Sequence, residues 1–204
     1  MREPINVSGM VLSASPVGEY DKRVVILTRE LGKITAFARG ARRMKSPLMA
    51  VSNPFVFGEF QVYEGRDSYT LSGANIKEYF LDLAQMQPGV YYGFYFLELA
   101  EYFGQEGNDE TQMLNLLYVT MNAICRGKQD LRLIRCIFEL RTITISGEAP
   151  QMFSCMECGT KENLTVFSLR DSAIYCPNCG KTIRDPWPLQ PGTVLACRYI
   201  IAAP

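Results

Sequence analysis

The sequence has 204 residues, of which 48% are hydrophobic and 21% are charged, which is ordinary usage for a globular protein. This length suits one large domain or two small ones, each able to bury a core. Because 21 basic residues balance 21 acidic ones, net charge alone indicates no partner. The start of the chain lacks the apolar run of a signal peptide, and the longest aromatic-rich stretch, residues 90–103, is too short to span a bilayer. These features predict a soluble intracellular protein.

Two absences exclude common classes of enzyme. The chain has no histidine, which removes Ser-His-Asp and Cys-His nucleophiles and every histidine-ligated metal site. It also has no G-x-x-x-x-G-K-[ST] phosphate loop and no G-x-G-x-x-G after a strand, so no ATP or dinucleotide site is indicated. We therefore predict that the chain is not an enzyme and that it has no catalytic residues.

The first segment, residues 1–80, has the pattern of short antiparallel strands. Runs rich in β-branched residues, bounded by turn signals, predict strands over residues 5–14, 22–29, 33–39, 55–64 and 69–71. Five short strands with no helix between the first three favour a small barrel. The five-stranded oligonucleotide-binding (OB) barrel is the leading candidate, because its second and third strands carry ligands.

The basic side chains of this segment are concentrated between residues 22 and 45. Eight cations face one acid, Glu30, which gives a net charge of +7 over 24 residues. The cations are Lys22, Arg23, Arg29, Lys33, Arg39, Arg42, Arg43 and Lys45. A local field of this sign attracts a polyanion, although a solvated basic surface without a ligand has the same pattern.

Residues 33–39 alternate between polar and apolar side chains. We predict that one face carries Lys33, Thr35, Phe37 and Arg39. A ring between cations that pair with phosphates suits single-stranded nucleic acid, so this face is a candidate binding surface. The alternative is that the faces are reversed and that Phe37 belongs to the barrel core. Three more aromatic residues are expected in that core: Phe55, Phe57 and Phe60.

From residue 81 the spacing of apolar residues becomes helical. Helices are predicted over 90–104, 109–126 and 130–145, the third with Asp130 as its N-cap. The second helix has an apolar stripe formed by Met113, Leu117, Met121 and Ile124. We expect the three helices to pack on one another and on the barrel. An exposed groove among them for a partner's peptide is the alternative.

The third segment contains two C-x-x-C pairs. Cys155-Met-Glu-Cys158 is followed, after seventeen residues, by Cys176-Pro-Asn-Cys179. Two such pairs can complete a tetrahedron of thiolates around zinc, whereas disulfides or a redox C-x-x-C are the alternatives. Four cysteine ligands leave no open position for water, so the zinc would be structural. It would contribute on the order of 10 kcal/mol or more to the folding of this segment.

Two glycines accompany the C-x-x-C pairs, and three further cysteines lie outside them. Gly159 and Gly180 directly follow the second cysteine of each pair, where a knuckle turn often needs a left-handed residue. The remaining cysteines lie in apolar helical contexts and are expected to be buried thiols: Cys125, Cys136 and Cys197. An odd number of unpaired cysteines fits a reducing compartment.

Several short motifs, taken in order, resemble the RecO family of bacterial DNA repair proteins. They are Gly18–Arg23 (GEYDKR), Leu27–Gly32 (LTRELG), Gly40–Arg43 (GARR) with Lys45 and Ser46, Tyr63–Gly65 (YEG), the two C-x-x-C pairs, and Leu189–Gly192 (LQPG). The resemblance implies an α+β chain in four parts. These are an N-terminal five-stranded OB barrel (1–80), an α-helical domain (81–150), an embedded four-cysteine zinc module (151–186) and a C-terminal helix that packs on the helical domain (187–204).

The resemblance also implies a recombination mediator of the RecF pathway. Such proteins bind single- and double-stranded DNA and anneal complementary strands without ATP. With RecR they help RecA displace single-stranded DNA-binding protein (SSB), in the cytoplasm and at the nucleoid. The matching DNA-binding positions are Lys22, Arg23, Arg39, Arg42, Arg43 and Lys45, to which the strand pattern adds Arg29, Lys33 and Phe37. The matching zinc ligands are Cys155, Cys158, Cys176 and Cys179.

Two other functions remain open on the residues alone. An OB barrel with a zinc ribbon could bind structured RNA or a transcription complex. A metal-dependent nuclease would need clustered carboxylates for magnesium, whereas the acidic residues are scattered here. Members of the RecO family usually continue beyond the helix that starts near Pro191, whereas this sequence ends at Pro204.

Overall fold

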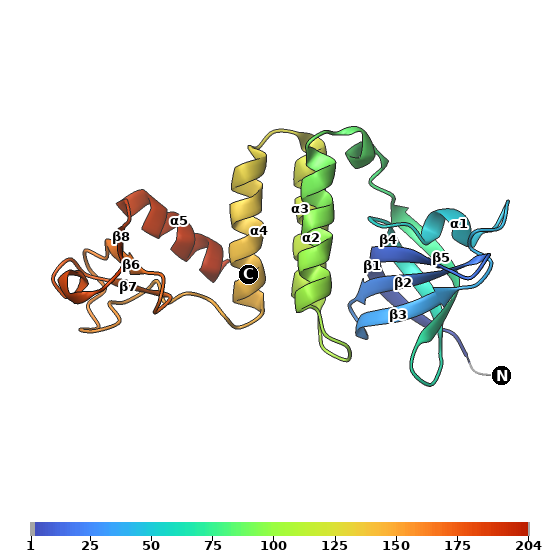
Figure 1. Ribbon diagram of the computed structural model, residues 1–204, viewed down its shortest axis with the longest axis horizontal. Coiled ribbons are helices and arrows are strands. Elements are labelled where there is room, and N and C mark those ends of the chain that lie inside the picture. The colour runs from blue at the N-terminus through green and yellow to red at the C-terminus, as the bar shows by residue number, and fades with distance from the viewer. Residues whose placement is uncertain (1–2, 204) are drawn as a thin grey trace. The chain divides into compact units, whose positions relative to one another are not determined.

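The structure is a computed structural model that describes residues 3–203. Residues 1, 2 and 204, at the outer ends of the first and last predicted segments, lie outside this range. The chain forms two units, of which the first ends at Phe138 and the second begins at Glu139. Helices and β-sheets are both present, with the barrel first along the chain, so the predicted α+β class is confirmed (Figure 1).

Five strands of the first unit form a closed barrel in the order β1-β2-β3-β5-β4. The strands are β1 (Ile5–Val17), β2 (Asp21–Thr28), β3 (Gly32–Ala38), β4 (Phe57–Glu64) and β5 (Tyr69–Glu78). All pairs are antiparallel except β3 and β5, whose short parallel contact closes the barrel. The five-stranded barrel is therefore confirmed. Its last strand is longer than predicted because it pairs with the whole of β4.

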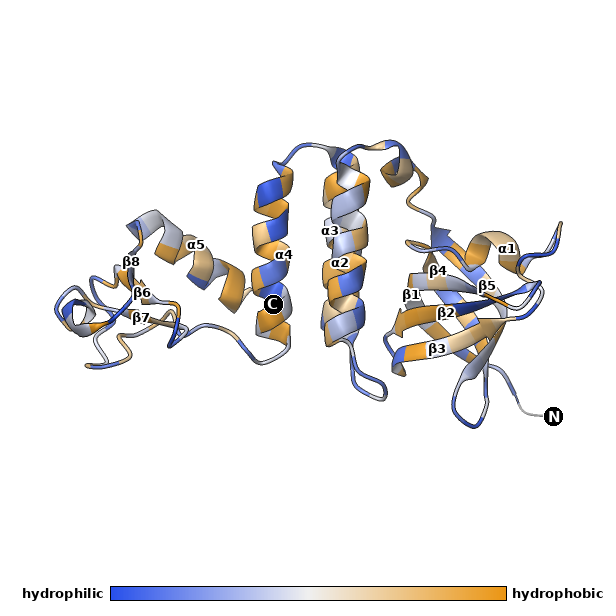
Figure 2. Cartoon of the chain, viewed as in Figure 1, coloured by the Kyte–Doolittle hydropathy of each residue, from blue (hydrophilic) through white to orange (hydrophobic). Residues whose placement is uncertain are grey.

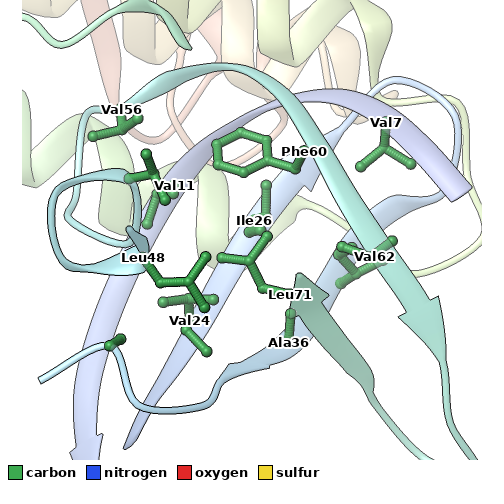
Figure 3. Close-up of a cluster of buried hydrophobic side chains, with 14 residues drawn as sticks. Val7, Val11, Val24, Ile26, Ala36, Leu48, Val56, Phe60, Val62 and Leu71 are labelled. Atoms are coloured by element: carbon green, nitrogen blue, oxygen red, sulfur yellow. The ribbon is translucent and has the colours of Figure 1, made fainter. Parts of the chain in front are cut away.

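Alternation along the strands fills the barrel with aliphatic side chains (Figure 3). In β3, Ile34, Ala36 and Ala38 are buried, whereas Phe37 is only half-buried on the other face. The predicted faces of this strand are therefore confirmed, and Phe37 is not a core residue. Phe60 of β4 is fully buried. The labelled core residues are Val7, Val11, Val24, Ile26, Ala36, Leu48, Val56, Phe60, Val62 and Leu71.

A single helical turn, α1 (Leu48–Val51), lies between β3 and β4. Its residues Leu48 and Val51 are part of the barrel core, so the turn covers one end of the barrel. The Ser52 hydroxyl donates a hydrogen bond to the carbonyl of Leu48 at 2.6 Å. The connection from β3 to this turn carries the basic residues 39–45, so barrel closure fixes both ends of that run.

The helices that follow were predicted to within a few residues. They are α2 (Gly89–Phe103), α3 (Thr111–Arg126) and α4 (Leu131–Ile145), preceded by the short 3-10 helix η1 (Leu81–Gln85). The predicted stripe of α3 is buried throughout: Met113, Leu117, Met121 and Ile124. The Asp130 carboxylate accepts the backbone N–H of Arg132 at 2.7 Å, as expected of an N-cap. Phe96 of α2 stacks on Phe138 of α4, with ring centroids 4.3 Å apart.

Helices α2 and α3 contact the barrel at β1 and β2. This contact corrects the expectation that Phe55 and Phe57 lie in the barrel core. Phe55 packs edge-on against Phe94 of α2, and Phe57 packs against Tyr118 of α3, each with ring centroids 4.7 Å apart. For Phe57 the reason is the phase of β4, because Gly58, Phe60 and Val62 point inward and Phe57 therefore points outward. Phe55 precedes β4, and its ring lies against Gly93 of α2.

The second unit contains a small sheet in the order β7-β6-β8. Its elements are β6 (Val166–Ser168), β7 (Ala173–Tyr175), the 3-10 helix η2 (Cys179–Thr182), β8 (Pro186–Pro188) and α5 (Pro191–Ala202). Val194 of α5 shares a hydrophobic cluster with Ile174 and Met152. The guanidinium of Arg141, from the second half of α4, donates to carbonyls at the end of α5, including that of Ala203 at 2.7 Å. Helix α5 therefore packs on the cysteine-rich module (residues 151–186) and is bonded to α4 through Arg141.

The prediction that Cys136 is buried is wrong, because this thiol is exposed. The buried side of α4 carries Ile134, Phe138 and Thr142, and Cys136 lies two residues, or about 200°, away from it. Figure 2 shows how hydrophobic and hydrophilic residues alternate along this helix. Cys125 and Cys197 are half-buried. Within residues 3–203, none of the helices combines the length and apolar character needed to cross a membrane.

Candidate nucleic-acid interface and metal centre

The four predicted ligand cysteines come together in the second unit. The sulfur atoms of Cys155, Cys158, Cys176 and Cys179 all lie within 4.8 Å of one another. The sulfurs of Cys158 and Cys176 are 3.9 Å apart, which is far longer than the ~2.05 Å of a disulfide bond. Four sulfurs at ~2.3 Å from one tetrahedral zinc lie about 3.8 Å from one another. The donor set therefore fits a metal ion of this kind.

Backbone hydrogen bonds favour the thiolate form of Cys155 and Cys176, whereas the neighbouring sulfurs oppose ionisation of Cys179. Burial opposes ionisation of Cys155, but hydrogen bonds from the backbone of Cys158, Cys176 and Glu157 hold its pKa at about 6. The backbone N–H of Cys179 likewise lowers the pKa of Cys176. The pKa of Cys179 is raised to about 12, first by its hydrogen bond with Cys176 and then by burial and the other sulfurs. A cation at the centre would neutralise this accumulated negative charge.

The two knuckle glycines have different structural roles. Gly159 has a φ of +73°, which confirms the predicted left-handed turn. The same prediction for Gly180 is wrong, because Gly180 is absent from the residues of positive φ among those described. Gly180 instead allows a close approach of β6, because its second α-hydrogen takes less room than a Cβ would. A Cβ at this position would lie 2.8 Å from Cγ2 of Val166 in β6.

Gly180→Ala should therefore destabilise the cysteine-rich module. Overpacking of this kind costs about 1–3 kcal/mol, because the Cβ of Val166, at 2.9 Å, is as close to the added atom as its methyl groups are. Gly192→Ala is the control, because a Cβ at Gly192 meets nothing within 4 Å. Thermal unfolding of the two variants measures the difference. Equal stability of Gly180→Ala and Gly192→Ala would contradict the close-approach explanation.

Five of the predicted DNA-binding cations gather at one end of the barrel. We call this surface the basic tip: Arg23, Arg39, Arg42, Arg43 and Lys45, all of which are at least partly exposed. Two hydrogen bonds bring the run after β3 onto the turn between β1 and β2. The backbone N–H of Gly40 donates to the Asp21 carboxylate at 2.7 Å, and that of Arg42 donates to the carbonyl of Tyr20 at 2.8 Å.

Aromatic rings lie beside these cations. Phe37 is directly opposite Arg23 in the register of β2 and β3, on the outer face of the barrel. The Arg43 guanidinium lies 4.9 Å from the centre of the Tyr20 ring, which is 42% exposed. Tyr20 was not among the predicted site residues. Its place within Gly18–Arg23, which contains the turn, is the signal that could have found it.

The other three predicted cations are not part of the basic tip, and two of them, Lys22 and Lys33, are held by other hydrogen bonds. The Lys22 ammonium donates to the Asn53 side chain at 2.7 Å, and burial followed by the charge of Arg42 lowers its pKa. Arg29 directly follows the end of β2, six residues after Arg23, or about 20 Å away. At that opposite end of the strand, the Lys33 ammonium donates to the carbonyl of Glu101 in α2. The basic run is therefore split into the five cations of the tip, Lys22 beside them, and two cations near the helices.

Comparison with known proteins assigns the chain to a family. Residues 1–80 match the family model described as Recombination protein O N terminal, and residues 89–204 match that described as Recombination protein O C terminal. The DNA repair protein RecO of Alkaliphilus metalliredigens is 36% identical over 176 residues, which cover 86% of this chain and 72% of that protein. That of Bacillus pumilus is 32% identical over 196 residues, covering 95% and 75% respectively. The chain belongs to the RecO family.

Membership of the RecO family supports a role in DNA repair by recombination. Two of the motifs that resembled RecO in the sequence also meet in space. The turn at the start of Gly18–Arg23 accepts hydrogen bonds from Arg42, both from its backbone and from its guanidinium, which donates to the carbonyl of Gly18 at 3.2 Å. The RecO motifs at this end of the barrel therefore form one local structure, the basic tip.

Proposed function

We propose that this chain binds single- and double-stranded DNA through its barrel and anneals complementary strands without ATP. The observation that carries the proposal is the basic tip on a closed five-stranded barrel of a RecO protein. The five cations of the tip face two nearby acids, Glu19 and Asp21, and Asp21 is already bonded to Gly40. The tip is therefore a locally positive surface, whereas the chain as a whole has no net charge.

Annealing follows from neutralising the charge of two strands that repel each other. Cations that pair with phosphates release counterions, and they leave the base edges free for pairing. Phe37 and Tyr20 add ring faces on which bases can stack without sequence preference. No step of this mechanism consumes a nucleotide, in agreement with the lack of a phosphate-loop motif in the sequence. No catalytic residue is proposed.

The predicted DNA-binding residues fall into three groups according to their position and to the contacts of their side chains. The basic tip and Phe37 are proposed as the main contacts. Arg29 and Lys33 are proposed as peripheral contacts for a longer strand, because they lie at the other end of β2 and β3. Lys22 is proposed to act mainly through its bond to Asn53, by holding the connection after α1 in place.

We further propose that the four cysteines hold structural zinc. The ion would have no open position for water, and its role would be to supply stability that the small cluster around Ile174 lacks. As a RecO protein, the chain is proposed to act in the cytoplasm and at the nucleoid, with RecR as a partner. In that setting it would help RecA load on DNA that is coated with SSB.

Annealing of two complementary labelled oligonucleotides, without ATP and across a salt series, tests this function. Five contacts to a single strand predict a slope of about −3.5 for log affinity against log salt, so a fourfold rise in salt should weaken binding about 100-fold. Annealing should fade over the same range. Tighter binding of folded RNA than of single-stranded DNA would favour the RNA-binding alternative, and binding without annealing would remove the annealing step.

A further inference from the structure

Within residues 3–203, the most exposed large hydrophobic side chain lies between two cations of the basic tip. Met44 is 89% exposed, and its neighbours Arg43 and Lys45 are exposed as well. Single hydrophobic residues are common on protein surfaces, so exposure alone indicates no function for Met44. The backbone that presents this side chain and the charges around it supply the argument.

A hydrogen-bonded turn holds Met44 at its apex. The backbone N–H of Ser46 donates to the carbonyl of Arg43 at 3.1 Å, so residues 43–46 form a β-turn with Met44 and Lys45 at its centre. The chain just before it is bonded too, because the N–H of Arg43 donates to the carbonyl of Gly40 at 3.0 Å. The thioether of Met44 is therefore held out into solvent by a bonded backbone.

This turn requires an unfavourable backbone conformation at Lys45. Its φ is +63°, in the left-handed region where glycine is the usual residue because it has no Cβ. A glycine at this position would relieve the strain but would remove a cation from the apex. Non-glycine residues in this region are concentrated at functional sites. The strain at Lys45 therefore points to a function for the apex, where a cation and an apolar side chain are adjacent.

The charges around Met44 indicate its partner. Three exposed cations lie within two residues of it, Arg42, Arg43 and Lys45, and none of them forms an ion pair within the described residues. The Arg43 guanidinium also contacts the exposed ring of Tyr20, so Met44 continues a surface that already combines cations with an aromatic ring. A polyanion with apolar surface between its charges complements this arrangement. Nucleic acid has that chemistry, because its stacked bases lie between charged phosphates.

We propose that Met44 inserts between neighbouring bases of a DNA strand whose phosphates are bound by Arg42, Arg43 and Lys45. This inference rests on the proposed DNA-binding function and deepens it, because it gives the tip a means of separating stacked bases. A methionine suits this role, since its unbranched thioether side chain fits irregular gaps and packs on aromatic rings. Opening a base step is easiest in a single strand, so Met44 should favour single-stranded over double-stranded DNA.

An oligonucleotide with one 2-aminopurine between adenines reports the insertion, because stacking on neighbouring bases quenches the emission of 2-aminopurine. A length of about ten nucleotides lies within the site size of an OB barrel. Saturation with the full chain should increase the emission. Saturation with Met44→Ser should leave it close to that of the free oligonucleotide. Met44→Leu should restore the increase, because leucine is apolar and similar in volume.

Met44→Ser should also weaken binding of single-stranded DNA about 5-fold or more, and binding of duplex DNA less. The slope of log affinity against log salt should stay as in the parent chain, because no phosphate contact is lost. The matched control is Leu169→Ser, which removes a side chain that is 61% exposed in the turn between β6 and β7 and is likewise next to an arginine. The control should bind DNA as the parent chain does. Anisotropy of an end-labelled oligonucleotide measures these affinities.

Three results would overturn the proposal. If Met44→Ser binds as tightly as Leu169→Ser and increases 2-aminopurine emission as the parent does, Met44 does not insert, and the charged tip remains the proposed contact. If Met44→Ser flattens the salt slope, the substitution acts through the cations and the shape of the turn. If the parent chain self-associates without DNA and Met44→Ser does not, a second copy covers the side chain. Absence of DNA binding by the parent chain would refute the proposed function itself.

Discussion

Cys155→Ser should release the metal and unfold the cysteine-rich module, with the first unit remaining folded. Cys155 is 1% exposed and belongs to the hydrophobic cluster of the second unit, so its loss removes a ligand and leaves a polar group in the core. Structural zinc contributes on the order of 10 kcal/mol or more to modules of this kind, which exceeds the total stability of many domains. The barrel has a separate core and should retain DNA binding.

Metal content by a chromophoric chelator, together with thermal unfolding, measures this effect. The parent chain should lose its lower transition when zinc is removed, and Cys155→Ser should lack that transition from the start. Cys136→Ser is the matched control, because Cys136 is an exposed thiol outside the cluster. Retention of bound zinc by Cys155→Ser would contradict the assignment of its ligands. Loss of DNA binding with the barrel intact would show that the module contributes to the DNA surface.

Arg42→Glu/Arg43→Glu should weaken single-stranded DNA binding and flatten its dependence on salt. Both side chains are exposed at the basic tip, so the substitution leaves the barrel core unchanged. Loss of two phosphate contacts should reduce the magnitude of the slope by about 1.4, from about −3.5 to about −2.1. Annealing should fall with it, because two new carboxylates repel both strands.

The control for this variant is Arg126→Glu/Lys128→Glu. It changes the net charge by the same amount at exposed positions of the first unit, outside the barrel. Binding isotherms at several salt concentrations for both variants separate a local contact from a general charge effect. Equal slopes in the two variants would move the DNA site away from the basic tip.

The period of the side-chain pattern and the spacing of the cysteines were sufficient to predict the structure where one physical rule dominates. Alternation along residues 33–39 predicts the outer position of Phe37, because a strand has two faces and one of them must be buried. The C-x-x-C spacing likewise predicts the four sulfurs that meet, because tetrahedral coordination allows few alternatives.

The errors occur where a residue responds to a distant element. Phe57 points out of the barrel because of its position in β4, and Tyr118 of α3 packs against it. No local sequence pattern indicates that contact. Gly180 is a glycine because Val166 lies against it, which depends on how η2 meets β6. The basic run reads as continuous in sequence, but the length of β2 separates Arg29 from the tip. Such features require tertiary structure.

The packing of the barrel on its helices determines which fragments of this protein can fold. A Cβ at Gly32 would clash with the carbonyl oxygen of Gln105, so the start of β3 is in close contact with the connection between α2 and α3. A fragment that ended at residue 80 would lose that connection and would expose Phe55 and Phe57 to water. Exposed aromatic patches of this kind promote aggregation. A soluble DNA-binding fragment should therefore extend to Phe138, and aggregation of a shorter one would say nothing about its affinity for DNA.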